Sequence, residues 1–277
     1  MMKVVILAGG FGTRITEESA IRPKPLIEIG GRPIIWHIMK IYSHFGFTDF
    51  VVLCGYKGDL LKQYFRDLLQ LSGEIVFDFR RHETTHVQQD FEPWQVTLVD
   101  TGLTTMTGGR LRRVRHLLTD TFCLTYGDGV ADVPINDLVA FHKEQGLLAT
   151  VTAISPPGRF GILKTNPHDR IVQGFREKHL DDSGLINGGF FVLEPGVLDL
   201  IEGDNTVWEQ EPMQRLVDAG QLQAYVHKGF WQNMDTLRDK QTLEDVWKTG
   251  NAPWKVWDRP EHQTSRLPLQ VVGEGRA

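Results

Sequence analysis

The chain has 277 residues, of which 41% are hydrophobic, 23% charged and 10% aromatic, a composition typical of globular proteins. Its formal net charge of −5 argues against a broad nucleic-acid-binding face or a basic membrane-surface segment. The apolar stretch at residues 4–8 is too short for a signal peptide or a membrane span. Cys54 and Cys123 lie in strand-like runs, so we expect buried thiols in a reducing compartment, and therefore a cytoplasmic protein.

The first seventy residues alternate between strand and helix patterns. Residues 3–8 and 50–54 are continuous apolar runs, typical of strands that are buried on both faces of a parallel sheet. Between them, apolar residues at helical spacing predict a helix that starts at Pro33 and ends at Gly46, and a second helix is predicted over residues 58–71. This order predicts an α/β sheet with right-handed crossovers.

Strand patterns predominate in the middle of the chain. They are predicted at residues 75–79, 96–99, 122–126, 150–154, 161–164, 171–175 and 189–192, and helices at 111–118, 208–219 and 236–248. We therefore predict one three-layer α/β/α domain over residues 1–257, with a Rossmann-like, mostly parallel mixed sheet and a small strand-rich insertion. Residues 258–277 are predicted to form a tail that is weakly ordered or lies at a subunit interface.

The strongest chemical signal follows the first predicted strand. It is a glycine-rich turn made of Leu7, Ala8, Gly9, Gly10, Phe11, Gly12, Thr13 and Arg14, and Lys24 follows between two prolines. Such a turn brings backbone N–H groups close to a phosphate chain, and Arg14 and Lys24 add charges suited to phosphate oxygens. The pattern is neither a Walker A loop nor the dinucleotide fingerprint, because it lacks their lysine and third glycine.

Two carboxylates form a second candidate site. Asp128 comes after the predicted strand 122–126, and Asp235 precedes the predicted helix start at Thr236. An Asp after a buried parallel strand projects into the crevice where ligands bind, and two such carboxylates suit Mg²⁺. A structural alternative is that Asp128 is a turn residue and that Asp235 is the N-cap of the last helix.

The glycine turn together with Pro23-Lys24-Pro25 resembles the signature of the sugar-phosphate nucleotidylyltransferases. Residues 106–111 (MTGGRL) and 229–240 (GFWQNMDTLRDK) resemble the glucose-1-phosphate cytidylyltransferase branch, and the resemblance extends from about residue 2 to Trp257. It implies a fold of the nucleotide-diphospho-sugar transferase type and transfer of a cytidylyl group from CTP to α-D-glucose 1-phosphate. It also implies Mg²⁺ as cofactor, a homo-oligomer (a hexamer), and a role in the supply of dideoxysugars for surface polysaccharide.

The resemblance assigns roles to individual residues. Catalytic roles are implied for Arg14, Lys24, Asp128, Lys178 and Asp235, with the metal on Asp128 and Asp235. The nucleotide is expected to contact residues 7–14, Lys24, Thr105, Gly108, Arg110 and Asp128, of which Arg110 belongs to an otherwise solvated basic stretch. The sugar phosphate is expected to contact Tyr126, Gly161, Glu177, Lys178 and Asn187.

Several alternatives remain open at this point. One is transfer of a thymidylyl or uridylyl group to the same sugar phosphate, and another is a catalytically silent regulatory subunit of the same fold. His82-Glu83-Thr84-Thr85-His86 fits the zinc-protease pattern, but its strand-like flank argues against the helix that this pattern requires. Finally, Trp254 and Trp257 lie in a Pro-broken segment that we predict to pack against a neighbouring subunit.

Overall fold

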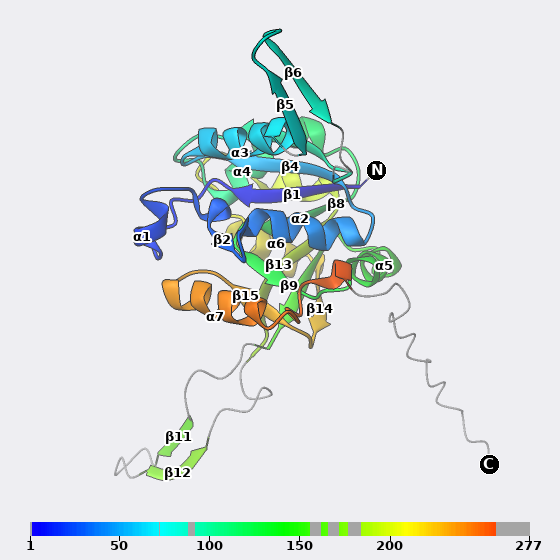
Figure 1. Ribbon diagram of the computed structural model, residues 1–277. Coiled ribbons are helices and arrows are strands. Elements are labelled where there is room, and N and C mark those ends of the chain that lie inside the picture. Colours follow the sequence, from blue (N-terminus) through cyan, green and yellow to red (C-terminus); the bar gives the residue numbers. More distant parts are fainter. Residues whose placement is uncertain are drawn as a thin grey trace, which may run out of the picture.

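A seven-stranded mixed sheet forms the centre of the computed structural model, which describes residues 2–71, 73–87, 92–155, 162–165, 172–176 and 184–258 (Figure 1). In spatial order its strands are β14 (Leu222–His227), β10 (Ala149–Ile154), β13 (Ile186–Leu193), β8 (Phe122–Tyr126), β1 (Lys3–Ala8), β4 (Asp49–Cys54) and β7 (Gln95–Asp100). Only β13 runs antiparallel to its two neighbours. The prediction of a mostly parallel mixed sheet is therefore confirmed.

Helices cover both faces of this sheet. One apolar core joins the sheet to α2 (Ile34–His44), α3 (Gly58–Leu71), α5 (Ile135–Gln145) and α7 (Leu237–Lys248). The opposite core joins it to α4 (Thr107–Arg113), α6 (Glu211–Asp218) and the 3₁₀ segment η4 (Pro195–Leu200). Successive side chains of a strand point to opposite faces, so Val4 and Ile6 belong to the first core and Val5 and Leu7 to the second. The predicted three-layer α/β/α architecture is confirmed.

Shorter elements complete the fold. They are α1 (Thr16–Ser19), β2 (Glu28–Ile29), β3 (Arg32–Pro33), β5 (Glu74–Asp78), β6 (Glu83–Val87), β9 (Gly129–Ala131), β11 (Ile162–Thr165), β12 (Val172–Arg176), β15 (Trp231–Asn233) and the 3₁₀ turns η1 (Lys24–Leu26), η2 (Arg115–Leu117) and η5 (Val256–Asp258). Strands β11 and β12 pair antiparallel with each other and form the predicted strand-rich insertion.

The helix predicted over residues 111–118 begins four residues earlier and ends sooner. Helix α4 covers Thr107–Arg113, and the separate turn η2 follows. Gly108 and Gly109 are poor helix formers, which is why the sequence favours a later start. In the structure both lie against the backbone of residues 204–206, where a side chain would clash, so tertiary packing decides this helix start. Helix α5 and strand β14 were not predicted.

The prediction that Trp254 and Trp257 pack against another subunit is wrong for Trp254. Its side chain is fully buried within its own chain, stacked near Trp247 and Phe230 and close to His37 of α2. Trp257 lies edge-on to Trp36, also within the chain. Long-range packing against α2 and α7 therefore covers a segment that has no regular structure of its own. The predicted tail lies outside the described residues, except for Asp258.

The zinc-protease pattern lies on a hairpin rather than a helix. Strands β5 and β6 pair antiparallel, and residues 83–86 belong to β6, as the strand-like flank predicts. His82 precedes them in the turn, with φ of 55°, and is exposed. Because positions 82 and 86 do not share a helix face, the arrangement that this pattern needs is absent from the described hairpin. None of the helices in the described part of the chain is long and apolar enough to cross a bilayer.

Candidate active site

A cavity of about 420 Å³ opens at the carboxyl edge of the sheet. Strands β1, β4, β7 and β8 run parallel and end at this edge, where ligands bind in open α/β sheets. Of the predicted residues, the cavity is lined by Leu7, Ala8, Gly9, Gly10, Phe11, Gly12, Thr13, Arg14, Lys24, Thr105, Arg110, Tyr126, Asp128 and Asp235. The fold thus brings the glycine turn, both candidate metal ligands and the basic residues together.

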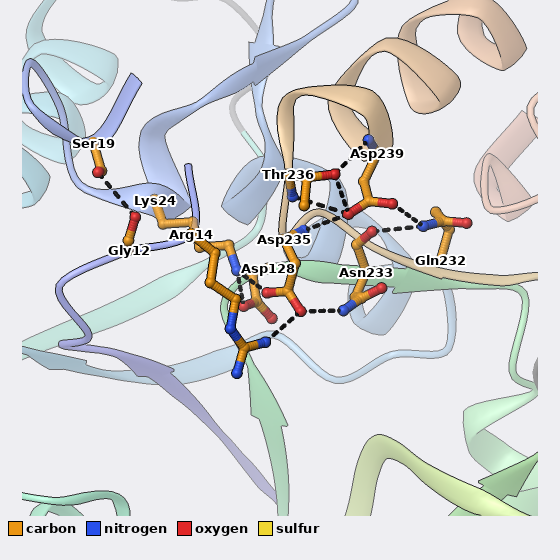
Figure 2. Close-up of polar contacts among 10 residues, drawn as sticks. All are labelled: Gly12, Arg14, Ser19, Lys24, Asp128, Gln232, Asn233, Asp235, Thr236 and Asp239. Atoms are coloured by element: carbon orange, nitrogen blue, oxygen red, sulfur yellow. Dashed lines mark hydrogen bonds and ion pairs between the residues drawn. The ribbon is translucent and has the colours of Figure 1, made fainter. Parts of the chain in front are cut away.

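Lys24 lies at the centre of the charged groups (Figure 2). Its Nζ donates hydrogen bonds to Asp128 Oδ2 and Asp235 Oδ1, each at 2.6 Å. Arg14 Nη1 donates to the other oxygen of Asp235 at 2.8 Å. The Lys24 side chain is only 12% exposed, whereas that of Arg14 is 75% exposed. Lys24 is therefore held inside the cavity, and Arg14 reaches over it from solvent.

A short strand pair brings the two carboxylates together although they are far apart in the sequence. Strands β9 and β15 pair antiparallel, with Asn233 opposite Gly129. Asp128 directly precedes this ladder and Asp235 follows it, and the Met234 amide donates to the Asp128 carbonyl at 2.8 Å. The register of β9 and β15 therefore places both side chains on Lys24.

Attraction between opposite charges has a larger effect than burial on the pKa values of Lys24 and Asp235. Burial alone acts against a charged Lys24, but Asp128 and Asp235 raise its pKa above the ordinary value. Burial likewise acts against an ionised Asp235, yet Lys24 and Arg14 bring the pKa of that carboxyl below its usual range. At neutral pH the cluster therefore contains an ammonium group and an ionised carboxylate in direct contact.

The N-cap of α7 is Thr236, not Asp235. Thr236 Oγ1 accepts a hydrogen bond from the Asp239 amide at 3.2 Å, and Asp239 Oδ2 accepts one from the Thr236 amide at 2.9 Å. This reciprocal pair is a capping box. The Asp235 carboxylate contacts Lys24, Arg14 and the Asn233 side chain instead, which rules out the alternative that it caps the helix.

The same two carboxylates fit a divalent cation of the magnesium type. One oxygen of each Asp contacts the same atom, Lys24 Nζ, so the two carboxylates lie close to each other, and Mg²⁺ in proteins is held by one or two carboxylates together with phosphate oxygens and water. Among the described residues, no cluster of three or more His, Cys, Asp or Glu side chains suited to a metal occurs. The described residues therefore do not form a metal site made of protein ligands alone.

Arg110 also lines the cavity and is only 4% exposed. From α4 its Nη1 donates to the carbonyls of Cys54 and Gly102 at 3.0 and 2.8 Å and to Thr101 Oγ1 at 2.7 Å, while Nη2 donates to the Gly9 carbonyl at 3.1 Å. Within the described chain no carboxylate lies within ion-pair distance of this guanidinium. Burial, and next the neighbouring Arg113, lowers the pKa of Arg110 from its very high ordinary value.

Arg110 also accounts for two glycines. A side chain at Gly9 or Gly55 would occupy the space of its guanidinium group. Arg110 thus joins the ends of β1, β4 and β7 and lies directly behind the glycine turn. Gly108, predicted to contact the nucleotide, is instead buried against Thr206, where a Cβ would approach the Thr206 carbonyl to 2.8 Å.

The predicted sugar side is described only in part. Tyr126 lines the cavity at the end of β8, and Asn187 of β13 donates from Nδ2 to the Tyr126 hydroxyl at 3.2 Å. Gly161, Glu177 and Lys178, which were predicted to contact the sugar phosphate, lie outside the described residues.

Sequence reasoning missed some residues at the cavity. Pro25, Leu103, Thr104 and Gly127 also line it, next to Met106 and Thr107, which belong to the segment 105–110 expected to contact the base. Glu209 contacts Tyr126 and Thr107 from the segment before α6. Glu209 lies in the segment 208–212 (WEQEP), which also resembles the family, and this resemblance is the signal that could have identified it.

The comparisons with known proteins agree with this site. The pattern of the family described as "Nucleotidyl transferase" matches residues 3–240. The chain therefore belongs to the nucleotidyl transferase family. The predicted family resemblance is confirmed, and the enzyme class follows from it.

Individual relatives narrow the resemblance. The chain is 52% identical to the glucose-1-phosphate cytidylyltransferase of Salmonella typhimurium over 259 residues, which cover 93% of this chain and 100% of the relative. It is 43% identical to a probable glucose-1-phosphate cytidylyltransferase of Bacillus subtilis, over 92% of this chain and 100% of the relative. The crystal structure of HddC from Yersinia pseudotuberculosis has the same fold, with a TM-score of 0.65 at 22% identity over 89% of this chain and 100% of that one.

Proposed function

We propose that the protein transfers the cytidylyl group of CTP to α-D-glucose 1-phosphate, forming CDP-glucose and diphosphate. The observation that carries this proposal is the cavity in which Lys24 contacts Asp128 and Asp235 next to the glycine turn. This arrangement suits a reaction between two polyanions. The relatives named glucose-1-phosphate cytidylyltransferase supply the choice of nucleotide and sugar.

In this reaction an oxygen of the sugar phosphate attacks the α-phosphorus of CTP in line, and diphosphate leaves from the opposite side. A phosphate monoester is already ionised at neutral pH, so the step needs no general base. The protein contributes position and charge neutralisation. Lys24 holds the attacking phosphate and the α-phosphate near each other, Arg14 and the backbone amides of residues 9–13 bind the triphosphate, and Lys178 assists at the sugar phosphate.

Mg²⁺ is the cofactor that we assign to Asp128 and Asp235. When bound, it neutralises phosphate charge and helps to align the triphosphate. The remaining work falls to the chain itself. Asp128 and Asp235 orient Lys24, and Arg110 keeps the glycine turn at a fixed distance from the ends of β4 and β7.

By the family resemblance, the pyrimidine base is expected to lie against the segment from Thr105 to Arg110. Leu103, Thr104, Thr105, Met106, Thr107 and Arg110 line the cavity and supply backbone groups next to the glycine turn. Cytosine carries an N4 donor where uracil carries an acceptor, so backbone carbonyls here would favour cytosine. Comparable turnover with UTP would retain the enzyme class and remove the preference for CTP.

A panel assay tests the proposal directly. Diphosphate release is measured with each nucleoside triphosphate, with and without glucose 1-phosphate and Mg²⁺, and the sugar nucleotide is identified by mass spectrometry. We expect release only when CTP, glucose 1-phosphate and a divalent cation are all present. No release with any nucleotide would instead favour a silent regulatory subunit.

Assembly and location belong to the same proposal. We expect a cytoplasmic homo-oligomer, a hexamer by resemblance, that supplies CDP-glucose for surface polysaccharide. The buried free thiols of Cys54 and Cys123 suit a reducing compartment, and burial raises the pKa of Cys54 to about 11. Phe77 and Phe79 on the β5–β6 hairpin are 58% and 85% exposed, and such apolar surface suits a subunit contact. Light scattering that shows a monomer at micromolar concentration would contradict the oligomer.

A further inference from the structure

Glu209 contacts two residues that line the cavity, although it is not one of the described lining residues itself. Its Oε1 accepts a hydrogen bond from the Tyr126 hydroxyl at 2.6 Å, and its Oε2 accepts one from the Thr107 hydroxyl at 2.7 Å. Tyr126 stands at the end of β8, and Thr107 is the first residue of α4; both line the cavity. One carboxylate therefore connects the expected sugar side to the expected nucleotide side.

The chemistry of a carboxylate fixes the direction of both hydrogen bonds. An ionised carboxylate accepts and never donates, so each hydroxyl directs its single proton toward Glu209. The Thr107 hydroxyl also accepts from the Trp208 amide at 2.9 Å, and the Tyr126 hydroxyl accepts from Asn187 at 3.2 Å. Toward a ligand, the Tyr126 hydroxyl can then offer only a remaining lone pair.

Neighbouring residues fix the Tyr126 ring, so that its hydroxyl continues to donate to Glu209. Gly189 has φ of +79°, and a Cβ there would approach the ring to 2.6 Å, so a glycine leaves room for the ring. The Gly189 amide donates to Asn187 Oδ1 at 2.8 Å, which orients the Asn187 amide toward the hydroxyl. Burial, followed by the Glu209 carboxylate, raises the pKa of Tyr126 far above its ordinary value, so the hydroxyl keeps its proton.

We propose that Glu209 is a positioning residue that makes the Tyr126 hydroxyl an acceptor for one hydroxyl group of the sugar. The inference rests on the proposed function, because it names how the same site recognises the sugar phosphate. A sugar that lacks a donor at that position leaves the lone pair of a half-buried hydroxyl unpaired, which weakens its binding. Selection of the sugar then depends on a residue outside the described lining.

The experiment compares E209Q with the matched control E211Q. Glu211 is two residues away, and its carboxylate pairs with Arg215 on the same helix. An amide in place of the Glu209 carboxylate presents a donor to one of the two hydroxyls, which must then turn. Steady-state kinetics are measured with glucose 1-phosphate and with its 2-, 3-, 4- and 6-deoxy analogues at saturating CTP.

We expect the unmodified protein to discriminate against one deoxy analogue by about tenfold in kcat/KM. E209Q and Y126F should both lose this discrimination through a higher KM for glucose 1-phosphate, whereas E211Q keeps it. The double variant E209Q/Y126F should lose no more discrimination than either single variant. Both substitutions disrupt the same hydrogen bond between Glu209 and the Tyr126 hydroxyl, so their effects should not add.

Three results would overturn the inference: E209Q discriminating as E211Q does, additive losses in the double variant, or no discrimination by the unmodified protein. Y126F keeps the test decisive should E209Q fold poorly, because it removes the same hydroxyl without altering Glu209. Absence of all CTP-dependent diphosphate release from the unmodified protein would instead refute the proposed function.

Discussion

Lys24 and Arg110 bring positive charge to the same cavity, but their surroundings differ. Lys24 Nζ contacts two carboxylates, those of Asp128 and Asp235. Arg110 contacts backbone carbonyls at the ends of three strands and one threonine hydroxyl. The first cation is held by charged side chains that can rotate; the second is held by the ends of the sheet, which cannot.

The difference between these surroundings indicates different roles for the two cations. Lys24 can exchange its carboxylate partners for phosphate oxygens, which leaves the carboxylates available to a metal ion, so Lys24 is suited to a place where charges rearrange during a reaction. Backbone carbonyls form a fixed set of dipoles, which is the preorganised arrangement that stabilises charge without rearranging. The charge of Arg110 is not paired with a carboxylate in the described chain, so its field remains available to an anionic ligand. Mutations should separate the two roles.

The largest effect is expected at the Lys24 cluster. Replacing Asp128 or Asp235 singly with Asn should lower turnover by a factor of at least about 100, because charge neutralisation carries most of the catalysis. The free energy of unfolding should change by only about 1 kcal/mol, since both side chains are partly exposed. Turnover as a function of Mg²⁺ concentration, measured beside thermal melts, checks both parts. An Asp235→Asn variant that melts early and stays active would reverse our assignment.

The second effect is expected for substitution of Arg110, which should mainly lower the stability of the protein. Arg110→Met leaves several buried carbonyls without their donor, and we expect a loss of about 3 kcal/mol in the free energy of unfolding. The KM for CTP should also rise, because the glycine turn loses its contact at Gly9. Urea denaturation measures the first part. Arg112→Met is the control, since Arg112 is exposed on the same helix; equal stability of the two variants would refute the structural role of Arg110.

His37 shows what burial does to a titratable group without a carboxylate partner. Its Nε2 donates to the Ile29 carbonyl at 2.8 Å and its Nδ1 accepts from Trp254 at 3.4 Å, a set that requires the neutral ring. Burial lowers the pKa of His37 to about 4. Below pH 6.5 the unfolded chain binds a proton that the folded chain does not, so stability falls as the pH decreases and levels off below about pH 4.

The expected size of this pH effect is about 2 kcal/mol at pH 5. His37→Gln can make similar hydrogen bonds but does not titrate. The difference in unfolding free energy between the two proteins, measured from pH 7.5 to pH 5, should therefore shift in favour of the variant. A constant difference over this range would show that His37 has the same pKa in the folded and the unfolded chain, as expected for a ring that is accessible to water.

The smallest effect is expected at Thr236, the N-cap of α7, and it distinguishes the role of this cap from that of the adjacent Asp235. Thr236→Ala removes the capping box of α7 and should cost about 1 kcal/mol of stability. Turnover should stay nearly unchanged, the opposite of the result expected for Asp235→Asn one residue earlier. Thr236→Ser retains the hydroxyl and serves as the control. A large loss of turnover in Thr236→Ala alone would mean that the cap also positions Asp235.

Much of the fold could be predicted because its signals are local. The buried runs of β1 and β4 and the amphipathic pattern of α3 need no knowledge of their neighbours. Helix α5 escaped prediction although Ile135, Leu138, Val139 and His142 are buried at helical spacing, because a buried histidine interrupts the apolar pattern. Strand β14 is a half-exposed edge strand, so its polar residues hide the strand signal.

The main chemical groups that line the cavity could be predicted without a structure. Glycines where a buried strand ends, a lysine between prolines and an Asp after a strand are identified from residue types and short spacings. How these groups meet follows only from the tertiary fold. The pairing of β9 with β15 places Asp128 and Asp235 on Lys24, and the common edge of three strands turns Arg110 from a surface cation into a buried one. Such contacts depend on strand register and burial between segments far apart in the chain, which no local pattern encodes.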